Sequence, residues 1–210
     1  MKEGAAGLVH VVEDDKALRA ALVRLIRSDG LEAVGHADAM GLDDNLGAYR
    51  PSCILLDIRL DGESGLNVQA ALRERGSTTP IIFLTGFGTI PMTVQAMRAG
   101  AVEFLTKPVD DDVLLDAVRR ALEMDASAVE RQHAEGDLAD RLMSLTDRER
   151  EVMALAIGGL MNKQIAGELG TTEITAKVHK RRMMTKMRAR SLPDLVRMAE
   201  TLGMQAARSR

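Results

Sequence analysis

The chain has 210 residues, 46% of them hydrophobic, which is enough to bury two modest cores. Its charge is unevenly distributed, with a net charge of −5 over residues 1–122, −4 over residues 123–144 and +6 over residues 145–210. This pattern excludes a broad nucleic-acid surface on the first two thirds of the chain and restricts such a surface to the last third.

Cys53 is the only cysteine, so an internal disulfide is excluded. It lies inside an apolar run, where a small buried side chain is a better interpretation than a redox thiol. No apolar run approaches the length of a membrane span, and the N-terminus lacks the apolar core of a signal peptide. We therefore expect a cytoplasmic protein with no membrane partner.

Strand and helix patterns alternate five times over the first 122 residues. Short apolar runs predict strands at residues 8–12, 32–36, 54–57, 81–84 and 101–106, of which 32–36 is the weakest. Helical patterns follow, from a cap at Asp15 to Gly30, over about 65–75, from Pro91 to Gly100, and from a cap at Asp110 to Leu122; a poorer one covers 40–46. Alternation of this kind predicts a doubly wound α/β fold with a parallel sheet.

The next residues, 123–144, form a connector rich in Ala, Glu, Asp and Gln, with Gly136 as its only strong helix breaker. We expect a solvated, partly helical segment. Its leucines at 138 and 142, together with Leu145, fit either a dimer seam or a loosely docked linker. The predicted division is thus residues 1–124, a linker at 125–143, and a second domain at 144–210.

From Thr146 to about residue 202 the sequence pattern predicts helices, which are interrupted at 158–159, 170–171 and 190–193. Thr146 and Glu149 have the spacing of a capping box. Two helices at 162–169 and 172–187, joined by a tight turn, outline a small all-α helix-turn-helix domain.

Chemically useful side chains lie at the carboxyl ends of four expected strands. These are the acids Glu13 and Asp14, the acid Asp57, the hydroxyl of Thr85 and the ammonium of Lys107. Carboxyl ends of parallel strands share one edge of the sheet, where ligands bind in such folds. Each residue alone has an ordinary explanation as a cap or surface charge, but the combination predicts one acidic pocket.

The pocket suits phosphoryl chemistry. Carboxylates of Glu13, Asp14 and Asp57 offer the oxygen ligands that Mg²⁺ prefers. With an ion on one oxygen of Asp57, the other oxygen can attack phosphorus and form an aspartyl phosphate. Lys107 would balance charge on the phosphoryl group, and Thr85 would donate a hydrogen bond to it.

Four short motifs carry a family resemblance over about residues 7–122: V-V-E-D-D at 11–15, L-L-D-I-R-L at 55–60, T-G at 85–86 and K-P at 107–108. In this order and spacing they resemble the receiver domain of two-component response regulators. The resemblance implies a flavodoxin-like (CheY-like) receiver with strand order 2-1-3-4-5. It also implies the following roles: Glu13 and Asp14 as the metal-holding pair, Asp57 as phospho-acceptor, the Arg59 carbonyl as a further ligand for Mg²⁺ (or Mn²⁺), Thr85 and Phe104 as the switch pair, and Lys107 before a cis Pro108.

One position departs from the receiver pattern. Receivers usually have Met-Pro after the acceptor loop, whereas this chain has Leu60-Asp61. We expect the loss of proline to loosen the turn. Asp61 adds negative charge near the metal, which bears on metal affinity and phosphorylation lifetime, although we expect its side chain to point to solvent.

The second helix of the helix-turn-helix outline is strongly basic, since residues 177–190 contain seven Lys or Arg and no acid. Ala176, Met183 and Met187 share one side, and Lys177, Val178 and Arg181 lie on the other. A basic run is often just a solvated face, but a packing stripe opposite a cationic face is what a helix in the major groove needs.

A second resemblance covers roughly residues 145–202. L-T-D-R-E-R-E-V-M at 145–153, N-K-Q-I-A at 162–166, K-V-H-K at 177–180 and the run at 187–199 resemble the FixJ/NarL/LuxR-type DNA-binding domain. The resemblance implies base contacts by Lys177, Val178 and Arg181, and phosphate contacts by Lys163, Thr175, Lys180 and Arg182. It also implies a dimer contact through the helix at 192–202.

These predictions combine into one expected function. We expect a response regulator that accepts a phosphoryl group on Asp57 from a sensor histidine kinase and then binds promoter double-stranded DNA as a homodimer. RNA polymerase is left open as a further partner, and no enzymatic activity is expected beyond the receiver's own phosphotransfer and dephosphorylation. One alternative is a constitutive DNA-binding protein whose receiver is a dimerisation scaffold. Another is a phosphatase-like enzyme with Asp57 as nucleophile, which would need a substrate-sized pocket.

Overall fold

A computed structural model of the chain describes residues 7–42, 46, 51–86 and 88–207. The chain divides into two compact units, residues 1–130 and 131–210, and each is described by itself. Residues 43–45 of the weak helix expected over 40–46 lie outside the described residues. Of that region the structure describes a short 3₁₀ turn, η1, at Ala39–Gly41.

The first unit is built on a parallel sheet. Its strands are β1 (Leu8–Val12), β2 (Glu32–His36), β3 (Ser52–Leu56), β6 (Ile81–Thr85) and β7 (Glu103–Thr106), in the order β2-β1-β3-β6-β7. This confirms the doubly wound fold and its strand order. Val12 pairs with Leu56 in register, so the residues that follow β1 and β3 emerge side by side at one edge of the sheet.

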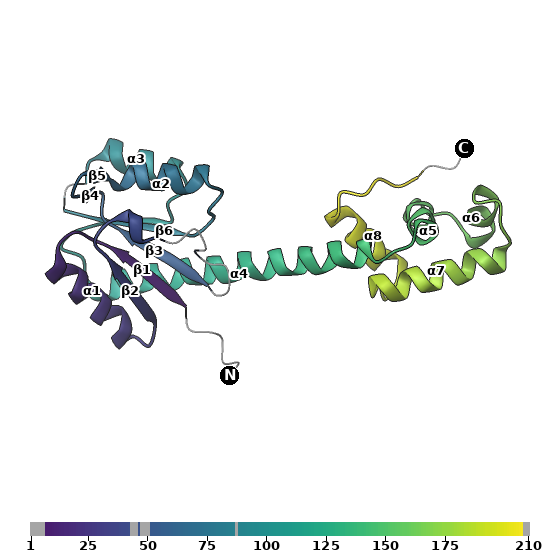
Figure 1. Ribbon diagram of the computed structural model, residues 1–210, viewed down its shortest axis with the longest axis horizontal. Helices are drawn as coiled ribbons and strands as arrows, with labels where there is room; N and C mark the ends of the chain where they lie inside the picture. The colour runs from purple at the N-terminus through teal and green to yellow at the C-terminus, as the bar shows by residue number, and fades with distance from the viewer. Residues whose placement is uncertain (1–6, 43–45, 47–50, 87, 208–210) are drawn as a thin grey trace. The chain divides into compact units, whose positions relative to one another are not determined.

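Helices cover both faces of this sheet (Figure 1). The elements are α1 (Lys16–Ser28), α2 (Gly65–Glu74), α3 (Ile90–Arg98) and α4 (Asp111–Met143). Apolar residues of α1 and α4 pack with those of one sheet face, and residues of α2 and α3 pack with those of the other. β3 is buried along its whole length, as expected for a central strand between two helix layers. The predicted cap of α1 is confirmed, because the Asp15 carboxylate accepts hydrogen bonds from the N–H groups of Ala17 and Leu18 at 2.7 and 3.0 Å.

The loop after β3 contains a short β-hairpin. β4 (Arg59–Leu60) and β5 (Glu63–Ser64) pair as an antiparallel hairpin. Gly62 closes the turn with a φ of 85°, which suits glycine, and Leu60 is buried in the core. The expectation that the loss of proline loosens this turn stays a prediction. Asp61 is exposed, as expected.

Helix α4 runs without interruption from Asp111 to Met143, so the expected helical linker at 125–143 is helical throughout, and Gly136 does not interrupt it. A single glycine costs a helix about 1 kcal/mol, and the surrounding Ala, Glu, Arg and Leu residues are strong helix formers that offset it. Leu138 and Leu145 are buried in the core of the second unit, and Leu142 packs against them. These leucines thus belong to a folded core rather than to a loosely docked linker.

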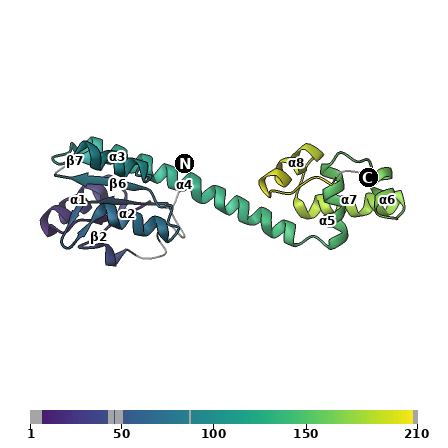
Figure 2. The same cartoon turned by 90° about the horizontal axis from the view of Figure 1, so that it is seen from above.

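The second unit consists of α5 (Asp147–Ile157), α6 (Asn162–Glu168), α7 (Glu173–Met187) and α8 (Leu192–Thr201), together with the end of α4 (Figure 2). The Thr146–Glu149 capping box is present at the start of α5. Ala176, Met183 and Met187 are buried on one side of α7, which confirms the predicted packing stripe. None of the helices in the described ranges is both long and apolar enough to cross a membrane.

Candidate functional site

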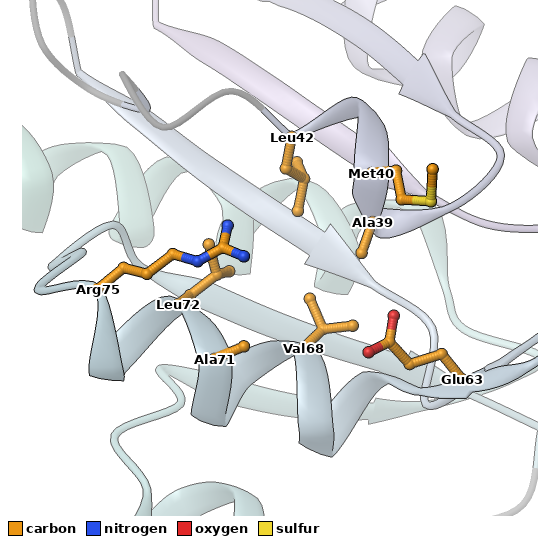
Figure 3. Close-up of a pocket in the computed structure, with 8 residues that line it drawn as sticks. All are labelled: Ala39, Met40, Leu42, Glu63, Val68, Ala71, Leu72 and Arg75. Carbon is orange, nitrogen blue, oxygen red and sulfur yellow. The ribbon is translucent and has the colours of Figure 1, made fainter.

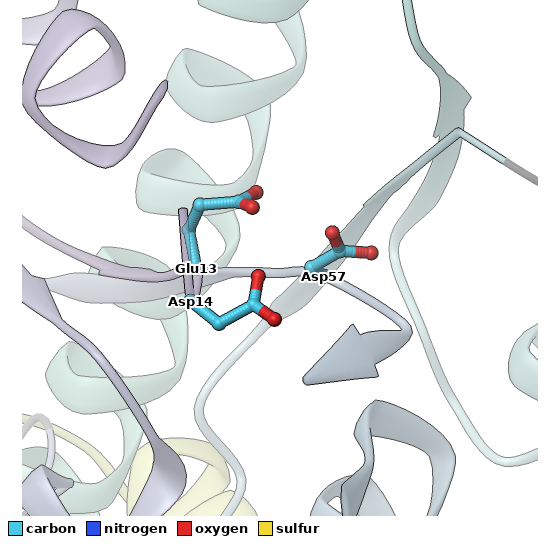
Figure 4. A group of neighbouring side chains, drawn as sticks. All are labelled: Glu13, Asp14 and Asp57. Atoms are coloured by element: carbon cyan, nitrogen blue, oxygen red, sulfur yellow. The ribbon is translucent and has the colours of Figure 1, made fainter. Parts of the chain in front are cut away.

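Three carboxylates meet at the carboxyl edge of the sheet. Glu13 and Asp14 follow β1, Asp57 follows β3, and one oxygen from each lies within 4.8 Å of the others (Figure 4). Glu13 and Asp57 are buried, with 3% and 8% of their surfaces exposed, whereas Asp14 faces solvent. Such a set of oxygen ligands, partly open to water, fits a divalent cation of the magnesium type.

Lys107 joins the same cluster from the end of β7. Its Nζ donates to Glu13 Oε2 and to Asp57 Oδ2, both at 2.6 Å. The Lys107–Pro108 peptide bond is cis, as the receiver resemblance implies, and the backbone N–H of Lys107 donates to the Thr85 carbonyl at 2.8 Å. The strand ends thus bring the acids and the lysine into one pocket.

In this pocket, burial and ion pairing shift the pKa values of the charged groups in opposite directions. Burial by itself lowers the pKa of Lys107, but the hydrogen bonds and negative charges of Asp57 and Glu13 outweigh it, so the pKa is raised. The pKa of Glu13 is raised, because burial together with the negative charge of Asp57 outweighs the hydrogen bond and positive charge of Lys107. Lys107 therefore does not fully offset the cost of burying the Glu13 carboxylate, and a divalent cation beside it would favour its ionised form.

The backbone after β3 holds Asp57 in place. The Asp57 N–H donates to the Val12 carbonyl at 3.0 Å, and the Arg59 N–H donates to Asp57 Oδ1 at 3.1 Å. The side chain of Arg59 is exposed. The role of its carbonyl as a metal ligand stays a prediction.

Gly65 supports this loop and was not singled out from the sequence. Its N–H donates to the Ile58 carbonyl at 2.8 Å, and a Cβ at this position would lie 2.2 Å from the carbonyl oxygen of Asp57. The signal in the sequence is Ser64-Gly65, a cap followed by a residue with no side chain, directly after the acceptor loop. The first turn of α2 can approach the acceptor only because residue 65 is glycine.

Thr85 and Phe104 lie on neighbouring strands. Thr85 ends β6 and is fully buried. Phe104 is partly buried on β7, with its ring centroid 6.2 Å from that of Phe83. A Cβ at Gly88 would lie 2.9 Å from the Phe104 ring, so the loop after β6 runs close over it. The pair has the placement that a switch needs, and its role stays a prediction.

Two hollows lie beside the acceptor loop and not over it. One, of about 530 Å³, lies between η1 and α2 and is lined by Ala39, Met40, Leu42, Glu63, Val68, Ala71, Leu72 and Arg75 (Figure 3). The other, of about 870 Å³, follows the β4–β5 hairpin. Neither includes the Asp57 carboxylate, so neither supplies the substrate space that a phosphatase-like enzyme would require.

The cationic face lies in the second unit. On α7 the side chains of Lys177, Val178, Arg181 and Arg182 are exposed, and those of Thr175 and Lys180 are partly buried at its edges. Lys163 is exposed on α6. Lys177, Val178, Arg181 and Arg182 are therefore exposed away from the packing stripe of α7, and the contacts of all the predicted residues with DNA stay a prediction.

Comparison with known families accounts for both units. Residues 9–119 match the response regulator receiver domain, and residues 143–199 match the bacterial regulatory proteins of the luxR family. The chain belongs to the two-component response regulators. The response regulator therefore combines a receiver with a LuxR-type DNA-binding domain, an organisation of transcription regulators and not of ordinary enzymes.

Relatives share this organisation over nearly their full length. The response regulator is 49% identical over 199 residues to Nodulation protein W of Bradyrhizobium diazoefficiens, covering 95% of this chain and 88% of the relative. It is 40% identical to the Transcriptional regulatory protein FixJ of Azorhizobium caulinodans, covering 95% and 94%. The solved structure of the response regulator StyR is similar with a TM-score of 0.82 and 43% identity, covering 93% of this chain and 99% of that one.

Proposed function

We propose that this response regulator accepts a phosphoryl group on Asp57 from a sensor histidine kinase and, once phosphorylated, binds promoter DNA as a homodimer. One observation carries the proposal. The carboxylate of Asp57 lies within 4.8 Å of Glu13 and Asp14 and is 2.6 Å from the Lys107 ammonium. This is the set of groups that phosphoryl transfer to a carboxylate requires.

In the proposed reaction an oxygen of Asp57 attacks the phosphorus of a phosphohistidine. The P–O bond forms as the P–N bond breaks, and the imidazole leaves with the electron pair. Mg²⁺ (or Mn²⁺), held by Glu13, Asp14, Asp57 and the Arg59 carbonyl, would supply positive charge to the phosphoryl oxygens. Lys107 offsets the remaining negative charge, and the Thr85 hydroxyl donates to one phosphoryl oxygen.

The acyl phosphate carries up to about two negative charges where the Asp57 carboxylate carried one, beside the carboxylates of Glu13 and Asp14. We propose that Thr85 and Lys107 move toward it and that Phe104 follows, which shifts the population of receiver conformations. The domains at 1–124 and 144–210 would communicate through the linker at 125–143. Promoter recognition would use Lys177, Val178 and Arg181 at base edges and Lys163, Thr175, Lys180 and Arg182 at phosphates.

The phosphorylation step is tested with acetyl phosphate and Mg²⁺. Wild type should gain the mass of one phosphoryl group, and Asp57→Asn should gain none. Asp61→Asn is a matched control, because this exposed acid lies on the same loop without belonging to the cluster, and it should still gain one phosphoryl group. Equal labelling of Asp57→Asn would remove the assignment.

DNA binding is tested by footprinting with phosphorylated and unphosphorylated protein. Affinity should fall steeply with salt, with a log–log slope of about −0.9 per phosphate contact. Lys163→Ala should weaken binding of all duplexes alike, whereas Arg181→Ala should relax base preference. Unchanged promoter affinity after Asp57→Asn would instead favour a constitutive DNA-binding protein.

A further inference from the structure

Helix α7 carries two exposed apolar side chains near its start. Ile174 is 78% exposed and Val178 is 43% exposed. Neither belongs to the hydrophobic core of the second unit, which includes Ala176, Met183 and Met187 from the same helix. Val178 was expected at base edges from the sequence, but Ile174 was not.

The position of Ile174 on the helix sets it apart from ordinary surface residues. Single exposed apolar side chains are common and carry no meaning alone. At about 100° per residue, however, Ile174 projects from the side of α7 opposite the buried stripe, in line with Val178 and Arg181 at i+4 and i+7. Lys177 lies beside this line, so two apolar side chains sit within an exposed cationic face.

The charge of this face identifies what can cover it. Lys177, Arg181 and Arg182 are exposed beside the two apolar side chains, and these cations complement the phosphates that flank a DNA groove. The first residues of a recognition helix are those that reach base edges in the major groove. The apolar group displayed in that groove is the C5 methyl of thymine.

We propose that Ile174, next to Val178, packs against a thymine methyl in the major groove and thereby sets base preference at one position of the binding site. This inference rests on the proposed DNA-binding function and deepens it. Arg181 and Lys177 would supply hydrogen bonds to neighbouring base edges, while Ile174 would supply an apolar contact that distinguishes thymine from the other bases.

The test uses the full-length protein treated with acetyl phosphate. A preferred site is first selected from random duplexes, and each of its thymines is then replaced in turn by deoxyuridine, which lacks only the C5 methyl. Wild type should lose about fourfold in affinity at one thymine, the factor expected for one buried methyl group. Ile174→Ala should bind the thymine and deoxyuridine duplexes equally, and Ile174→Val should keep part of the preference.

Met161→Ala is the matched control, because Met161 is another apolar residue of this unit, 75% exposed, just before α6. It should discriminate thymine from deoxyuridine as wild type does. The inference is overturned if Ile174→Ala retains the full preference, or if it weakens all duplexes equally, as a contact with the DNA backbone or with a protein partner would. If wild type selects no site at all, the proposed DNA-binding function itself fails, which is a distinct outcome.

Discussion

Replacing Gly65 by alanine adds one methyl group where α2 begins, and the structure leaves no room for it. The new Cβ would lie 2.2 Å from the Asp57 carbonyl oxygen, more than 1 Å inside ordinary van der Waals contact. Relief requires α2 to move away, which breaks the 2.8 Å bond from the Gly65 N–H to the Ile58 carbonyl. We estimate about 1 kcal/mol for the lost bond and about 1–3 kcal/mol for the overpacking. Alanine gains at most about 1 kcal/mol in helix propensity, so the net loss should be about 1–3 kcal/mol.

The assay uses Cys53, the only cysteine, as a reporter of receiver unfolding, because it is fully buried in β3. For a urea m-value of about 2 kcal/mol per M, the midpoint for thiol labelling should fall by about 1 M. Labelling of Asp57 by acetyl phosphate should also slow, since the loop after Asp57 loses its hydrogen bond to α2. Gly136→Ala is the control, because a Cβ there meets nothing within 4 Å and alanine favours the helix, so this midpoint should not fall. An unchanged midpoint for Gly65→Ala would refute the steric reasoning.

Three further predictions concern buried groups away from the acidic pocket. Asp125→Ala should lower the free energy of unfolding by about 1–3 kcal/mol, because the Ser52 N–H that donates to Asp125 at 2.8 Å loses its buried acceptor. Burial raises the pKa of Asp125. The wild type should therefore gain stability relative to Asp125→Asn as the pH falls from neutral toward 3.8. A difference in unfolding free energy that stays constant with pH in urea titrations would contradict this. The hydrogen bond from Lys186 lowers the pKa of Glu149. The wild type should therefore have stability above pH 4.5 that it loses on acidification, and Glu149→Gln should lack this contribution. Equal acid unfolding curves for the two proteins would count against the ion pair. Burial raises the pKa of Cys53 to about 12. Labelling of the Cys53 thiol at pH 8 without urea should therefore be limited by the rate at which the fold opens. Fast labelling of the native protein would contradict the burial of this thiol.

Much of the receiver could be predicted from the sequence because its signals are local. Apolar runs located the strands, Asp15 marked the start of the first helix, and the strand ends located the acids around Asp57. The alternation of strands and helices then determined the edge at which those acids meet. The pocket was thus predictable from pattern and topology together.

The parts that were missed depend on tertiary packing. The connector was predicted to be partly helical, but the neighbours of Gly136 and the burial of Leu138 maintain the helix throughout. The importance of Gly65 arises from the close approach of another segment's carbonyl, which no local pattern reports. The exposure of Ile174 likewise became visible only once the buried side of α7 was known.

The two ion pairs of Lys107 have a consequence for how the receiver reaches its folded state. Glu13, Asp14 and Asp57 repel one another, and such groups often keep a site unfolded until a cation arrives. Here the ammonium that bridges Glu13 and Asp57 is part of the chain itself and accompanies them during folding. The receiver therefore carries its own counter-ion, and it should remain folded in the presence of a chelator.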